Sequence, residues 1–179
     1  MLDDCALLDW LAGEVAVVSM AATDAAPPLI YELTVSHLSG GSRTGVPWTV
    51  WVLPDSYEAD VPCRAWPTVR QAPPWDEVAD WIATMLGART ILVYDQHADT
   101  VLRMHLPDYP FPRILHATEI AARAWPDLNR ALRADRSLRP PLPRYRPPAS
   151  AQDAAMTELI ARVLISASSR ARRGLRGGP

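Results

Sequence analysis

The sequence of 179 residues contains no lysine, so all 18 of its lysine-plus-arginine residues are arginines. Only two cysteines are present, Cys5 and Cys63, and their separation matches no metal-ligand spacing. No apolar run reaches the roughly 18 residues that a membrane-spanning helix needs. The N-terminus carries acids where a signal peptide would carry basic residues. These absences exclude disulfide-stapled and membrane-spanning proteins, and we expect a cytoplasmic protein with two free thiols.

Charge is divided unevenly along the chain. Residues 1–100 contain 4 arginines and 14 acids, whereas residues 101–179 contain 14 arginines and 6 acids. The formal net charge of −2 conceals this division. The asymmetry indicates either a basic surface that binds phosphate or two halves whose charges partly neutralise each other.

Hydrophobic periodicity predicts a chain in which strands come first and then alternate with helices. The first three strands are joined by turns short enough for an antiparallel meander. We therefore expect an α/β fold with a ribonuclease H-like mixed sheet, three antiparallel strands followed by two parallel ones, flanked by helices. The predicted strands are residues 14–20, 29–38, 46–53, 90–94 and 113–116, and the predicted helices are residues 2–11, 75–86, 97–105, 117–124 and 150–166.

The remaining stretches set the expected domain boundary. Prolines make residues 55–74 and 139–148 irregular in the prediction, because proline lacks a backbone donor and fixes φ. We expect a single domain over residues 1–167 and a basic, disordered tail over residues 168–179.

Tryptophan and histidine are the remaining candidates for binding. Trp48 and Trp51 lie three apart in a predicted strand and should point to opposite faces, whereas Trp81 is predicted to lie in the core. Three further tryptophans lie near loops, where they either pack or stack on a base: Trp66, Trp75 and Trp125. The four histidines show no metal spacing: His37, His97, His105 and His116.

Several segments match, in order and spacing, the motifs of one nuclease family. The first strand ends in SMAAT (residues 19–23), QAPPWDEV (71–78) opens the first long helix, and ILVYDQHAD (91–99) joins a strand to the next helix. ATEIAAR (117–123) and PASAQDA (148–154) follow. Together these segments resemble the DnaQ-like, or DEDDh, 3′–5′ exonucleases, the family that includes RNase T.

The resemblance implies a nuclease site with two divalent ions about 4 Å apart, held by four carboxylates, and a histidine that takes the proton from the attacking water. Transferred residue by residue, Asp99 and Asp153 are retained. Ser19 and Ala21 stand where the family has Asp and Glu, and Pro148 stands where it has the histidine. The resemblance therefore implies a remnant site whose ordinary catalysis is lost.

Two alternatives remain for the retained acids. Asp99 and Asp153 could still hold one Mg²⁺ or Mn²⁺ if nuclease activity persists, although we expect no cofactor otherwise. They could instead be first-turn acids that the helix dipole favours. The groups that could complete a rebuilt site are Asp24, Glu32 and Asp95, with His97 as the base.

Arginines in the C-terminal half form either a solvated face or a strip that contacts phosphates. The predicted nucleic-acid-binding residues are Arg130, Arg133, Arg136, Arg144, Arg146, Arg170, Arg172 and Arg173, with Arg139 and Arg176 in the same series. The leading hypothesis is a catalytically degenerate exonuclease fold that binds single-stranded nucleic acid or a protein partner. The alternatives are a divergent metal-dependent 3′–5′ exonuclease and an assembly subunit that binds no nucleic acid.

Overall fold

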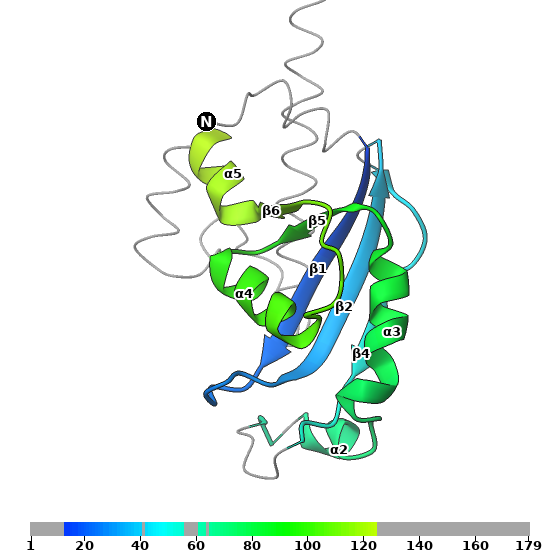
Figure 1. The fold of residues 1–179 in the computed structure, drawn as a ribbon, viewed down its shortest axis with the longest axis vertical. Coiled ribbons are helices and arrows are strands. Elements are labelled where there is room, and N and C mark those ends of the chain that lie inside the picture. The colour runs from blue at the N-terminus through cyan, green and yellow to red at the C-terminus, as the bar shows by residue number, and fades with distance from the viewer. Residues whose placement is uncertain (1–12, 41, 56–60, 64, 125–179) are drawn as a thin grey trace, which may run out of the picture.

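A computed structural model describes residues 13–40, 42–55, 61–63 and 65–124 (Figure 1). These residues form a mixed sheet of six strands with the order β3-β2-β1-β5-β6, and β4 pairs with β2 beside β3. The strands are β1 Glu14–Ala22, β2 Ile30–Ser39, β3 Ser42–Arg43, β4 Trp48–Trp51, β5 Thr90–Val93 and β6 Ile114–His116. The helices are α2 Trp66–Val69, α3 Trp75–Leu86, α4 Gln96–His105 and α5 Ala117–Ala124.

Strand β1 is where the sheet changes direction. It pairs antiparallel with β2 along its whole length and parallel with β5 from Val15 to Val17. Strand β4 continues the antiparallel part on the far side of β2, and β6 continues the parallel part beside β5. This arrangement confirms the α/β, ribonuclease H-like mixed sheet. The short strand β3 lies in the turn expected between the predicted strands 29–38 and 46–53, because the β2 ladder extends to Ser42 and Arg43.

Helices α3 and α4 begin and end at the residues that their chemistry favours. Asp76 and Glu77 lie in the first turn of α3, where the helix dipole favours acids. Gly87 ends α3 with a φ of 56°, which only glycine adopts at little cost. The side chain of Asp95 caps α4, so this helix begins one residue earlier than the periodicity predicts.

The two faces of the sheet bury different clusters. On one face, residues of β1, β2 and β5 pack against Val78, Ile82 and Leu86 of α3 and against α4. On the other face, Tyr31 packs with Ala65 and Val69. Trp48 borders the first cluster and Trp51 the second, which confirms that they point to opposite faces.

Two predictions about this region were wrong. Helix α2 interrupts the stretch that we expected to be irregular, because Pro67 sits in its first turn, where no backbone donor is needed, and Val69 is fully buried. Trp81 is not in the core, since its relative exposure is 51%. It lies about 100° around the helix from the fully buried Ile82, at the edge of the buried face, where its ring contacts Trp48 of β4.

No helix in the described part of the chain is long and apolar enough to cross a membrane. Cys63 is a free, exposed thiol. The predicted helices over residues 2–11 and 150–166, the irregular stretch 139–148, the tail 168–179, Cys5 and Trp125 all lie outside the described residues.

Candidate functional site

Ser19 and Ala21 lie near the end of β1 on the face opposite α4. They alternate with Val18 and Met20, which belong to the cluster beneath α3 and α4. Ser19 pairs with Thr34 of β2, and residues directly opposite each other in a sheet share a face. Ser19 is 8% exposed and Ala21 is partly buried, so this end of β1 carries a hydroxyl and a methyl group where the exonuclease motif would have two carboxylates.

Glu32 is a carboxylate on the same face of the sheet as Ser19 and Ala21. It is the register partner of Ala21 and the last residue of the regular β1–β2 ladder, because the register shifts only after this pair, between Ala21 and Ala22. It is only 6% exposed. The other groups considered for a rebuilt site lie elsewhere, since Asp24 and His97 are exposed and the Asp95 side chain accepts a 2.9 Å hydrogen bond from the Ala98 N–H.

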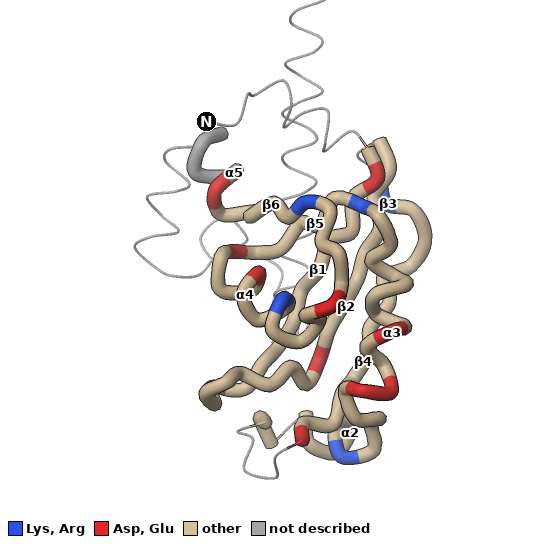
Figure 2. Tube along the Cα trace, in the orientation of Figure 1, with Lys and Arg blue, Asp and Glu red and all other residues tan. Residues whose placement is uncertain are grey.

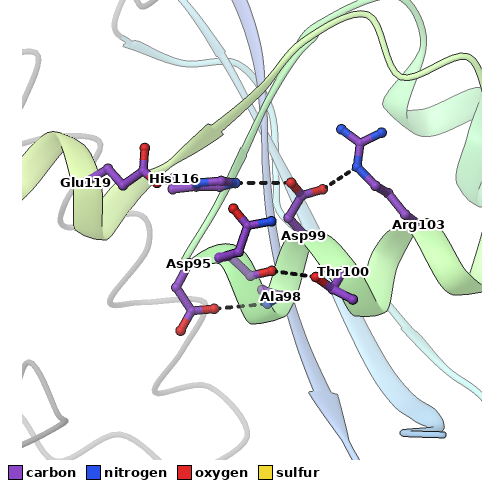
Figure 3. A network of polar contacts seen from close by, with 8 residues as sticks. Asp95, Ala98, Asp99, Thr100, Arg103, His116 and Glu119 are labelled. Atoms are coloured by element: carbon purple, nitrogen blue, oxygen red, sulfur yellow. Dashed lines mark hydrogen bonds and ion pairs between the residues drawn. The ribbon is translucent and has the colours of Figure 1, made fainter. Parts of the chain in front are cut away.

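Asp99 lies in the first turn of α4 and is the centre of a polar network (Figure 3). Its carboxylate is 8% exposed. Oδ1 accepts a 2.7 Å hydrogen bond from Nε of Arg103, one turn further along the same helix. Oδ2 is 3.1 Å from Nε2 of His116, at the end of β6. Both oxygens of the retained motif acid are therefore bound to cationic side chains of this chain.

His116 lies between two carboxylates (Figure 3). Its Nε2 faces Asp99 and its Nδ1 lies 3.0 Å from Oε1 of Glu119 in α5. A neutral imidazole has a single N–H, so only the doubly protonated ring donates to both acids. Burial lowers the pKa of His116, but the hydrogen bonds and charges of Glu119 and Asp99 outweigh it and leave the pKa above its ordinary value.

The network joins α4 to the β6–α5 junction and balances its own charge when His116 is protonated. Arg103 and the protonated His116 are then the cations, and Asp99 and Glu119 are the anions. The guanidinium of Arg103 also lies 4.8 Å from the centre of the Phe111 ring, a cation–π contact. Across the described ranges, no group of three or more His, Cys, Asp or Glu side chains could hold a metal ion.

Known structures supply a comparison for this arrangement. The sequence matches no protein-family model and no curated protein. Product-bound exonuclease I aligns with a TM-score of 0.60 at 13% identity, over 88% of this chain and 44% of that one. The chain has an exonuclease I-like fold. Exonuclease I in complex with the SSB C-terminus also aligns with a TM-score of 0.60 at 13% identity, over 88% of this chain and 42% of that one.

The metal-free form of E. coli exonuclease I bound to single-stranded DNA gives a TM-score of 0.57 at 14% identity, over 88% of this chain and 41% of that one. This chain thus spans less than half the length of each exonuclease I chain. The exonuclease-like, ribonuclease H-like fold expected from the motifs is confirmed.

Within this exonuclease I-like fold, the described remnants of the site are associated with opposite faces of the sheet. His116 is the register partner of Val93, which packs in the cluster on the α3 and α4 side. Asp99, bonded to His116, is therefore tied to that side, whereas Ser19 and Ala21 face the other. The remaining site predictions lie outside the described residues: Pro148, Asp153, Arg130, Arg133, Arg136, Arg144, Arg146, Arg170, Arg172 and Arg173.

Sequence reasoning missed His116, Arg103 and Glu119. His116 had no metal spacing, and its role depends on β6 lying beside β5 in the sheet. One signal was available, because His116 and Glu119 are three residues apart at a strand-to-helix junction, and Asp99 and Arg103 are four apart on one helix.

Proposed function

We propose that this protein is an exonuclease-fold protein that has lost nuclease activity and acts by binding single-stranded nucleic acid. The observation that carries the loss of activity is the state of Asp99. Its two carboxylate oxygens are bound by Arg103 and His116. The β1 positions that would complete a metal site in a related nuclease hold Ser19 and Ala21.

Electrostatics argues against a metal ion at Asp99. A divalent ion there would displace the largely buried hydrogen bond to His116, which contributes about 1.5–3 kcal/mol, and the exposed ion pair with Arg103, which contributes about 0.3–0.5 kcal/mol. It would also lie close to a guanidinium and an imidazolium, and like charges at such distances repel strongly in a partly buried site. One carboxylate that is already neutralised offers too little negative charge to compensate for this repulsion.

Nucleic-acid binding rests on charge and on fold. The chain beyond residue 100 has 14 arginines against 6 acids, which suits a phosphate backbone. A structure with the same fold, that of E. coli exonuclease I, holds single-stranded DNA. We place the phosphate contacts on the arginine series that begins at Arg130 and continues to Arg173.

Glu32 supports a second candidate, a divergent Mg²⁺- or Mn²⁺-dependent 3′–5′ exonuclease. Its carboxylate is buried directly across from Ala21, on the face that Ser19 shares. A carboxylate supplied by the neighbouring strand could take the place of the one missing from β1. This candidate also needs Asp153 as a second metal ligand.

A nuclease assay separates the two candidates. End-labelled single-stranded DNA and RNA are incubated with the purified protein in Mg²⁺, Mn²⁺ or EDTA, and we expect no trimming. Glu32→Gln is the informative variant, and Asp80→Asn, at an exposed position on α3, is its matched control. Metal-dependent trimming that Glu32→Gln abolishes and Asp80→Asn retains would establish the second candidate and refute the loss of activity.

A binding assay tests the first candidate directly. We expect the full chain to bind labelled single-stranded DNA or RNA with an affinity that falls steeply as salt rises, because each phosphate contact releases counterions. Replacing Arg130, Arg133 and Arg136 by glutamine should weaken binding and flatten the salt dependence. Arg70→Gln, at an exposed position in the described part, should change neither. Absence of binding at low salt would contradict the proposal and leave an assembly subunit.

A further inference from the structure

Trp81 is a large apolar side chain that the fold leaves exposed. Its relative exposure is 51%, and its ring meets Trp48 edge-on, with centroids 4.3 Å apart and planes at 77°. Trp48 is packed against the core, so it holds Trp81 in place at the surface. An indole fixed in this way presents contact area at a small cost in conformational entropy, which is typical of binding surfaces.

The neighbours of Trp81 on α3 are acidic. Glu77 lies one helical turn before Trp81, Asp80 directly precedes it, and Thr84 lies one turn after Asp80; all of these residues are exposed. We call these four residues the Trp81 face. Helix α3 contains no basic residue, and Figure 2 shows acidic positions along it. Neither Glu77 nor Asp80 forms an ion pair with another residue in the described part of the chain.

An aromatic ring beside carboxylates is suited to a guanidinium group. Arginine stacks on aromatic faces and forms paired hydrogen bonds with carboxylates, and it combines the two more readily than lysine does. The chain already uses this combination, because Arg103 lies against the Phe111 ring while it binds Asp99. The acids of the Trp81 face would repel a phosphate backbone, which excludes nucleic acid as the occupant.

We propose that the Trp81 face binds the arginine-rich C-terminal segment of this chain, residues 168–179. This segment contains Arg170, Arg172, Arg173 and Arg176 and no acid, so the Trp81 face competes with nucleic acid for the last three arginines of the proposed phosphate-contacting series. Acidic residues outnumber arginines in the described part of the chain (Figure 2), so most of the arginines that could pair with the Trp81 face lie elsewhere in the sequence. The occupant is the segment of the same molecule, because a tethered segment reaches its site at a high effective concentration.

The test uses the full-length chain with its four tail arginines replaced by glutamine as the receptor. A fluorescent peptide of residues 168–179 is the probe, and its anisotropy reports binding. We expect binding that weakens with salt, and a two- to fivefold loss of affinity for Trp81→Ala, in keeping with an exposed cation–π contact. Adding Glu77→Gln and Asp80→Asn should bring the loss to about tenfold. Met104→Ala removes an apolar side chain that is 49% exposed on α4, and it should leave the affinity unchanged.

The unmodified chain then identifies the source of the segment. If the segment binds its own molecule, the unmodified chain takes up the peptide more weakly than the receptor does at every protein concentration and stays monomeric. Self-association of the unmodified chain that Trp81→Ala prevents would place the segment on a second copy and overturn its assignment to the same molecule. The proposal would be overturned if Trp81→Ala and its parent bound the peptide equally well. It would also be overturned if a peptide with glutamine at every arginine bound as well as the original peptide.

Discussion

Replacing Asp99 by asparagine separates an acid that holds the fold together from an acid that holds a metal. The substitution keeps the size and shape of the side chain and removes its charge. An amide offers a single acceptor oxygen, so it satisfies one of its two donors and presents its own N–H groups to the other. We expect Asp99→Asn to lower the free energy of unfolding because His116 or Arg103 loses its partner.

The magnitude follows from the exposure of the two partners. The side chains of His116 and Asp99 are 12% and 8% exposed, so their 3.1 Å contact is a charged hydrogen bond largely shielded from water. Such a bond contributes about 1.5–3 kcal/mol. The Arg103 side chain is 51% exposed, and an exposed i,i+4 ion pair contributes only about 0.3–0.5 kcal/mol. Asp99→Asn should therefore cost about 2–3 kcal/mol, mostly through His116.

Urea unfolding in EDTA, followed by circular dichroism, measures this loss. Arg103→Gln should cost no more than about 0.5 kcal/mol, because its ion pair with Asp99 is exposed on one side. Asp80→Asn, an exposed acid on α3, should stay within about 0.5 kcal/mol of the parent. Addition of Mn²⁺ should leave the unfolding midpoint of the parent unchanged.

The opposite pattern would refute the argument. In an empty metal site, clustered carboxylates repel one another, so removing one charge stabilises the protein in EDTA. A ligand that binds only the folded state also raises stability in proportion to its binding. If Asp99→Asn is more stable than the parent in EDTA, and Mn²⁺ stabilises the parent but not the variant, Asp99 is a metal ligand.

Three further predictions concern single side chains. The pKa of His116 is raised in the folded state, so its stabilising effect is complete below its unfolded-state pKa of about 6.5 and is lost as pH rises through the higher folded-state value. The urea midpoint of the parent should therefore fall over that pH range, and the midpoint of His116→Gln should not. Trp81→Ala should cost less than about 1.5 kcal/mol, whereas Ile82→Ala, at a fully buried position, should cost about 2–5 kcal/mol in the same assay. Asp95→Ala removes the cap of α4 and should cost about 0.5–2 kcal/mol in thermal unfolding, without altering the pH dependence that His116 confers.

Sequence patterns predicted the strands well where local physics alone decides. Strand β5 is an apolar run between a helix-ending glycine and a capping aspartate, and Ile91, Leu92 and Val93 are fully buried as expected. Helix α2 escaped prediction because four residues are too few to show a helical period. The prediction for Trp81 was wrong because a hydrophobic pattern locates the edges of the buried face of a helix only to within about one residue.

The site was predictable only in part because its contacts depend on the order of strands in the sheet. The positions of Ser19 and Ala21 near the end of β1 follow from the local pattern. The partnership between Asp99 and His116 requires β6 to lie beside β5, and no periodicity specifies which strands are neighbours. The same holds for Glu32, whose place opposite Ala21 depends on the register in which β2 pairs with β1.

The unequal pairing of β1 has a consequence for the motion of its end. Its first residues are hydrogen-bonded to strands on both sides, but pairing with β5 stops at Val17, so from Ser19 onward β2 is its only partner among the described strands. Strand segments held on one side open at lower free energy and exchange their amide hydrogens sooner. We expect a step in exchange rate between Val17 and Ser19, so that the stretch occupied by metal ligands in a related nuclease lies in the faster-exchanging part of the strand.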